Sequence, residues 1–179
     1  MTQPLYVLVY PSRLFAAHWS LWAPRIEASG QESVVGDRIH VTGDRLNGFQ
    51  YEYIQNYNVD KDERNPKAFP IGRIKTSHLE HGEQSTASSD GETHELKAIN
   101  AFDRACQEVE APGPSLNKVS IGDNAEIPGP PRRRSEVKDC QWWIKQAVAN
   151  LVEANILLPL SPEEGKDDPV KRVSELPKH

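Results

Sequence analysis

The sequence predicts an α+β fold in which an antiparallel sheet of about four to six strands packs against two main helices. Three observations support this prediction. The chain has 179 residues, which is enough for one domain with a hydrophobic core and too few for two comfortable ones. Its first half contains short runs of apolar and β-branched residues separated by turn residues, which is typical of antiparallel strands. Its second half changes to the three- and four-residue apolar spacing of amphipathic helices.

Five strands are predicted in the first half of the chain, at 4–10, 15–22, 38–42, 48–57 and about 71–77. Pro11 ends the first strand, because proline lacks the N–H that a strand ladder needs. The polar segment 24–36 and the sequence GDRLNG at 43–48 supply the loop and the turn that follow. Side chains alternate between the faces of a strand, so His18 and His40 can both point to one side of the sheet.

Two helices are predicted in the second half. The first begins near Thr93 as N-cap, and its apolar stripe is Leu96, Ile99, Phe102, Cys106 and Val109. The second covers about 140–156, and its apolar stripe includes Trp143, Ala147, Leu151 and Ala154. We expect one domain at 1–160, with a polar loop at 80–92, a long Pro/Gly-rich loop at 112–138 that could act as a lid or substrate wall, and a flexible tail at 161–179.

The composition argues against several classes of function. A net charge of −5 does not suit a protein that neutralises nucleic-acid phosphates. The apolar run LYVLVY is too short for a secretory signal or a membrane span, so we expect a cytoplasmic protein without a stable membrane anchor. Two cysteines do not form a disulfide framework. No motif requires a cofactor or a metal, and the sequence does not indicate an oligomeric state.

The candidate chemistry lies in HWSLW at 18–22, IHV at 39–41 and DCQWW at 139–143. Asp139 is a favourable N-cap, so Cys140 falls in the first turn of a helix, where the helix dipole favours a thiolate. The carboxylate of Asp139 opposes this effect, and a neighbouring imidazole would be needed to activate the thiol. His18 and His40 are the two histidines that the predicted sheet could supply.

These motifs, in this order, resemble those of the lecithin:retinol acyltransferase-like family, which comprises circularly permuted papain-like thiol enzymes of the NlpC type. The resemblance covers most of 4–156. It implies that His18 is the general base, that His40 orients it and that Cys140 is the nucleophile, with Asp139 where the family often has Asn. The chain differs from the lipid-acting members in a longer gap between the histidines, in QWW after the cysteine, and in having no hydrophobic anchor after the last helix.

Three functions are therefore considered. The first is a thiol hydrolase or acyltransferase that acts on an amide, ester or thioester bond of a small-molecule, acyl or peptide substrate. The second is a cyclase or isomerase of a small metabolite that uses the same residues without hydrolysis. The third is a catalytically inactive binding module. For the enzymes, the substrate pocket is expected to include the residues Trp19, Trp22, Gln141, Trp142 and Trp143.

Each candidate also has a purely structural interpretation. His18 could be a hydrogen-bonded core histidine, His40 an exposed strand residue, and Cys140 a small apolar residue at a helix start. Cys106 is expected to pack in the core. The HLEH sequence at 78–81 has the spacing of a weak zinc site without further ligands nearby. Asp37 and Asp44 are expected to be turn residues. Because Trp142 and Trp143 are adjacent, only one of them should enter the core.

Overall fold

The computed structural model describes residues 1–12, 16–80, 98–114, 138–161 and 167–179. Its centre is a six-stranded sheet in the order β4-β3-β2-β1-β5-β6, in which every pair of neighbours is antiparallel. The strands are β1 (Thr2–Tyr10), β2 (His18–Ile26), β3 (Glu32–Asp44), β4 (Gly48–Asn58), β5 (Lys67–Lys75) and β6 (Leu157–Leu158). The predicted α+β class with an antiparallel sheet is confirmed.

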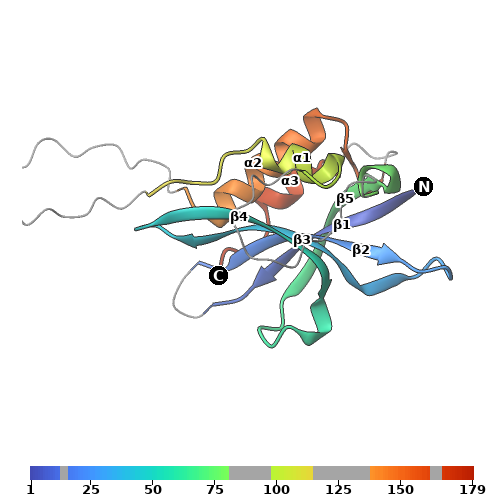
Figure 1. The fold of residues 1–179 in the computed structure, drawn as a ribbon, viewed down its shortest axis with the longest axis horizontal. Helices are drawn as coiled ribbons and strands as arrows, with labels where there is room; N and C mark the ends of the chain where they lie inside the picture. Colours follow the sequence, from blue (N-terminus) through green and yellow to red (C-terminus); the bar gives the residue numbers. More distant parts are fainter. Residues whose placement is uncertain (13–15, 81–97, 115–137, 162–166) are drawn as a thin grey trace, which may run out of the picture.

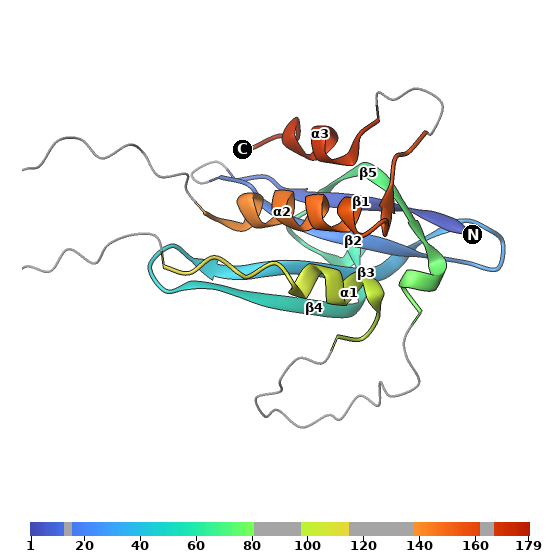
Figure 2. The same ribbon diagram turned by 90° about the horizontal axis from the view of Figure 1, so that it is seen from above.

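The three helices all cover one face of this sheet (Figures 1 and 2). They are α1 (Ala101–Gln107), α2 (Cys140–Glu153) and α3 (Pro169–Ser174). Two short 3₁₀ turns, η1 (Val59–Lys61) and η2 (Thr76–His78), flank β5. The connection from β4 to β5, which includes η1, lies on the opposite side of the sheet from the helices (Figure 1).

The main hydrophobic core lies between the sheet and the helices. Its fully buried members include Trp19, Leu21, Ile39, Trp143 and Leu151. Burial of large apolar side chains such as these provides most of the free energy that holds helices on a sheet, at about 2–3 kcal/mol for each large side chain. The other face of the sheet has a small cluster of Leu8, Tyr10 and Trp22.

The turn of the β3–β4 hairpin fixes the register in which these two strands pair. The Asp44 carboxylate accepts hydrogen bonds from the backbone N–H groups of Leu46 and Asn47, so its predicted role as a turn residue is confirmed. Gly43 has φ +139°, and a Cβ there would come within 2.2 Å of the Gly48 carbonyl oxygen. Glycine is therefore needed at the start of this turn.

Several predicted boundaries differ from those observed. β2 ends later and β3 begins earlier than predicted, because ladder hydrogen bonds continue into the polar residues of the 24–36 segment. β2 begins at His18 rather than at 15, and β5 begins and ends earlier than its predicted range of about 71–77. Helix α1 is shorter than predicted and has Asn100 as its N-cap, with the side chain accepting from the Asp103 N–H. Residues 81–97 and 115–137 lie outside the described part of the chain. They include the expected N-cap Thr93 and most of the predicted loops at 80–92 and 112–138.

Residues 167–179 do not form the flexible tail that their charge predicts. Val173 of α3 is fully buried, and Leu176 is 9% exposed in the same core. The indole Nε1 of Trp19 donates to the Pro177 carbonyl, and the Ala17 N–H donates to the Lys178 carbonyl. A few apolar residues spaced between charged ones are enough to hold this segment on the domain. Among the described residues, no helix has the length and apolar character to cross a membrane.

Candidate functional site

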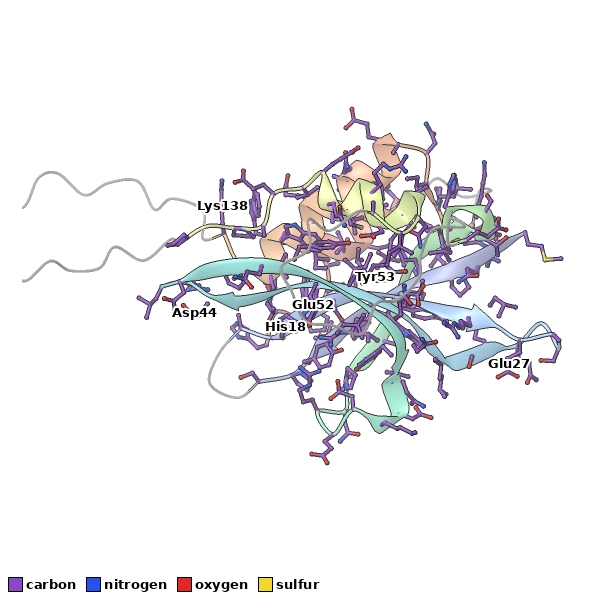
Figure 3. The ribbon with its side chains drawn as sticks, in the orientation of Figure 1. His18, Glu27, Asp44, Glu52, Tyr53 and Lys138 are labelled. Atoms are coloured by element: carbon purple, nitrogen blue, oxygen red, sulfur yellow. The ribbon has the colours of Figure 1, made fainter. Side chains whose placement is uncertain are left out.

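Strand alternation separates the candidate residues onto two faces of the sheet. On β2 and β3, Trp19, Leu21, Ile39 and Val41 belong to the core beneath the helices. His18, Ser20, Arg38 and His40 therefore lie on the opposite face, where the His18 ring is 5.5 Å from the Tyr10 ring. The prediction that both histidines share one face is confirmed. Figure 3 shows His18 and Glu52 near each other on this side of the sheet.

A chain of hydrogen bonds connects a carboxylate to the two histidines. The regular pairing of β2 with β3 ends at Leu21 and Ile39, and the rings of His18 and His40 meet just beyond this point. His18 Nε2 is 2.8 Å from His40 Nδ1, and His40 Nε2 is 2.6 Å from Glu52 Oε2. His40 is 5% exposed, whereas the Glu52 side chain is 48% exposed. The order along the chain of bonds is Glu52, His40, His18.

The sequence reasoning did not identify Glu52 as part of the site. A signal for it exists, because Glu52 is directly opposite His40 in the β3–β4 ladder. The Asp44–Gly48 turn sets this register, and cross-strand partners on one face are neighbours. His40 is four residues before Asp44 and Glu52 is four residues after Gly48, so the turn places the carboxylate beside the imidazole.

The hydrogen bonds determine which nitrogen of each neutral ring carries the proton. An ionised carboxylate can only accept, so His40 Nε2 donates to Glu52. His40 Nδ1 must then accept, and Arg38 NH2, which can only donate, lies 3.4 Å from it. His18 Nε2 therefore donates to His40 Nδ1. It follows that His18 Nδ1 carries an unshared electron pair, and no hydrogen bond among the described residues engages it.

Burial and nearby cations keep both rings neutral at physiological pH. Burial is the main cause that lowers the pKa of His18 to about 3, and the interaction with the His40 ring and the charges of Arg38 and Arg64 act in the same direction. Burial also lowers the pKa of His40 to about 3, again with contributions from Arg38 and Arg64. At neutral pH both rings are therefore unprotonated on one nitrogen, and a proton transferred to either ring would be released readily.

An aromatic and cationic network surrounds the two histidines. The Arg38 guanidinium carbon lies 5.0 Å from the centroid of the Tyr10 ring and 4.9 Å from that of Tyr57. The Tyr10 and Tyr57 hydroxyl oxygens are 3.0 Å apart, and Tyr57 donates to Asp62. Asp62 in turn forms an ion pair with Arg64. The segment around η1 is thus joined by Tyr57 and Asp62 to the network that contacts the Arg38 guanidinium.

Cys140 is on the other side of the sheet, in the core beneath the helices. It is 9% exposed, and no hydrogen bond among the described residues joins it to His18 or His40. Burial raises the pKa of its thiol; the backbone N–H groups of Trp19, Gln141 and Cys140 itself oppose this effect, and Asp139 adds to it. In Figure 3, Lys138, just before this helix, lies on the helix side, away from His18. The expected thiol–imidazole contact is therefore not formed.

Comparison with protein families gives a match to one described as a family of unknown function, DUF6540, over residues 5–158. The chain belongs to the DUF6540 family. Comparison with curated proteins and with solved structures gives no match. The matched region of this DUF6540 chain contains His18, His40, Glu52 and Cys140, so the site and the thiol both fall within the family domain.

The residues expected to line the pocket of this DUF6540 domain do not converge. Trp19 and Trp143 are fully buried in the core, and Trp142 is half-buried with Lys138 Nζ 4.8 Å from its ring, so only one of the adjacent pair enters the core, as predicted. Trp22 lies on the opposite face against Tyr6. Gln141 donates to the Ala17 and Lys178 carbonyls and thus ties α2 to two backbone segments.

The remaining candidates have structural roles or fall partly outside the described residues. Cys106 is fully buried in the core, as expected. Asp37 is in the middle of β3 and accepts a hydrogen bond from Tyr53, so the turn assignment is wrong for this residue. His78 lies in η2 and His81 is not described, and no group of metal ligands occurs among the described residues.

An open hollow of about 670 Å³ lies at the far end of β2, where Gln3, Pro24 and Asp37 contribute to its lining. Its lining does not include the histidines or Cys140.

Proposed function

We propose that this chain is an enzyme that moves protons on a small-molecule substrate, as an isomerase or cyclase, with His18 as the general base and acid. One observation carries the proposal: the Glu52–His40–His18 chain of hydrogen bonds, from which we infer an unshared electron pair on His18 Nδ1. Carboxylate–imidazole arrangements of this kind orient catalytic bases and stabilise the cation that forms when the base accepts a proton.

The proposed reaction conserves every atom of the substrate. His18 Nδ1 removes a proton from a carbon or oxygen of the substrate and becomes an imidazolium. The imidazolium, whose N–H can exchange with solvent, then delivers a proton to a different atom, which completes an isomerisation or a ring closure without an oxidant or a second substrate. His40 and Glu52 hold the ring and stabilise its transient positive charge through the hydrogen bonds of 2.8 and 2.6 Å. They act as positioning residues.

Thiol-dependent acyl transfer is the second candidate, and one observation favours it. The sulfur of Cys140 lies in the first turn of α2, where the backbone N–H groups of Trp19, Gln141 and Cys140 lower the pKa of the thiol against the effect of burial. N–H groups in this arrangement can also stabilise an oxyanion. Trp19 directly follows His18 and points to the opposite face of β2, so acyl chemistry would require the start of β2 to rotate until His18 faced the thiol.

Solvent deuterium exchange separates these candidates. A panel of small carbonyl compounds and carboxylic acids is incubated with the protein in deuterium oxide. NMR follows the loss of the proton signals of each compound. We expect exchange with the wild-type chain and with Cys140→Ala, and at least a hundredfold slower exchange with His18→Gln. His78→Gln is the matched control, because His78 lies in η2, outside the Glu52–His40–His18 chain.

Three results would count against the proposal. Exchange that is equal in His18→Gln and wild type would remove His18 from the mechanism. Exchange that is lost only in Cys140→Ala would favour the thiol mechanism. A panel in which no compound exchanges would favour the non-enzymatic binding module.

A further inference from the structure

Arg38 is a permanently charged side chain buried beside the histidines. It is 3% exposed, and it projects from β3 on the same face as His40. Burying an ionised group is unfavourable unless a counter-charge and hydrogen bonds compensate for the lost hydration. The guanidinium has five N–H donors, and the stability of the buried charge depends on how many of them the domain itself pairs.

Those contacts satisfy only part of the guanidinium. Arg38 Nε donates to Ser20 Oγ at 3.1 Å, and NH2 lies 3.4 Å from His40 Nδ1. The second contact is weak, because the single electron pair of Nδ1 already accepts from His18 at 2.8 Å. The Tyr10 and Tyr57 rings attract the cation but offer no electron pair in the plane of the guanidinium.

No carboxylate among the described residues forms an ion pair with Arg38. The two acids nearest in the network have other partners, since Glu52 binds His40 and Asp62 binds Arg64. The side of the site next to His18 thus has a buried positive charge whose partner is not supplied by the described part of the chain.

We propose that Arg38 binds the carboxylate of a small organic substrate and so places that substrate against His18. This inference rests on the proposed function, because it names the substrate class of the His18 site. A carboxylate is planar and carries one negative charge, so it can pair with two N–H groups of one guanidinium. A phosphate dianion would leave a surplus negative charge close to Glu52 and Asp62.

The position of Arg38 connects substrate binding to the base. Arg38 NH2 and His18 Nε2 both contact His40 Nδ1, so the guanidinium and the His18 ring are neighbours. A bound carboxylate would offset the Arg38 charge, one of the causes that hold the pKa of His18 at about 3. His40, Arg64, Glu52 and the Tyr10 ring are the other groups near His18 and remain in place. Substrate binding would therefore raise the basicity of His18 when it is needed.

The test uses sodium benzoate as the probe and reads binding in two independent ways. In the full chain labelled at histidine, NMR at pH 7 follows the imidazole signals of His18 and His40 as benzoate is added at constant ionic strength. Broadening of the benzoate proton signals measures binding directly. For the wild type we expect saturable binding and a shift of the His18 signals that saturates at the same benzoate concentration.

The variants assign the binding to Arg38. Arg38→Lys keeps the charge but loses the planar fork, and we expect at least tenfold weaker benzoate binding. Arg38→Gln should abolish it. Arg64→Gln is the matched control, because Arg64 also lies over the Tyr10 ring, at 4.4 Å, but is already paired with Asp62. It should bind benzoate as the wild type does. Circular dichroism confirms that each variant is folded, and Arg38→Lys serves if Arg38→Gln does not fold.

The inference and the proposed function can fail separately. His18→Gln should retain benzoate binding even though it loses proton exchange, so loss of exchange alone does not bear on Arg38. Binding that is unchanged in Arg38→Lys, or lost equally in Arg64→Gln, would overturn the inference. So would the absence of saturable binding to the wild type, or equally tight binding of sulfate, a tetrahedral dianion.

Discussion

Acidification below pH 6.5 should destabilise this domain through His18 and His40. Both have a pKa of about 3 in the folded chain, against an ordinary value of 6.5 in the unfolded one. Between these values the unfolded chain binds more protons, so the contribution to stability is fully present above pH 6.5 and is lost progressively as the pH falls toward 3. Each pH unit is worth about 1.4 kcal/mol for one fully shifted histidine.

Integrated from pH 7 to pH 5, this gives a loss of about 2 kcal/mol for one histidine. Because the rings share a hydrogen bond, they titrate as a pair, and we expect a total loss of about 2–4 kcal/mol. The pKa values of Asp44 and Asp62 are also lowered, but from an ordinary value of 3.8, so their effect falls below about pH 4, outside this window.

Urea unfolding followed by tryptophan fluorescence at pH 7, 6 and 5 measures the loss. The double variant His18→Gln/His40→Gln should lose most of this pH dependence, whatever its stability at pH 7, and His78→Gln should keep it. A double variant with the same pH dependence as the wild type would refute the reasoning, as would a wild type that becomes more stable on acidification.

Three further predictions test the site and the core. Diethyl pyrocarbonate at pH 5, read by mass spectrometry, should modify His18 faster than ordinary histidines, because its Nδ1 stays unprotonated there; preferential labelling elsewhere would contradict the assigned tautomer. Burial raises the pKa of Cys140 and Cys106, so both should react slowly with iodoacetamide at pH 7 until urea unfolds the chain; rapid labelling of Cys140 would favour the thiol mechanism. Leu151→Ala should lower the free energy of unfolding by about 3 kcal/mol, since Leu151 is fully buried, and a loss below 1 kcal/mol would count against the packing described.

Much of the fold could be predicted from local patterns. Alternating residues located the first five strands, and Asp139 was correctly expected to cap α2, where its side chain accepts from the Trp142 N–H. The prediction of a flexible tail at 161–179 was wrong for residues 167–179. Charged residues dominate the composition of this segment, but its packing depends on Val173 and Leu176. Composition averages over a segment, whereas burial depends on individual positions.

The separation of Cys140 from the histidines also had a signal in the sequence. The face of β2 and β3 opposite His18 and His40 has large apolar residues such as Trp19 and Ile39. The apolar stripe of α2 should therefore pack on that face, because burial of apolar area drives helix–sheet packing. The order of the motifs suggested a triad, but it did not specify the face on which the helix would lie.

The sequence by itself determined that His18 and His40 share a face, because side-chain alternation is a property of one strand and needs no distant contact. Only the tertiary structure decided what those histidines meet. The β3–β4 register brought Glu52 to His40, the end of the β2–β3 pairing brought the two rings together, and the return of the chain around η1 enclosed Arg38. These contacts join residues 12 to 22 positions apart or connect separate strands, and chain closure over such separations is fixed by the packing of the whole sheet.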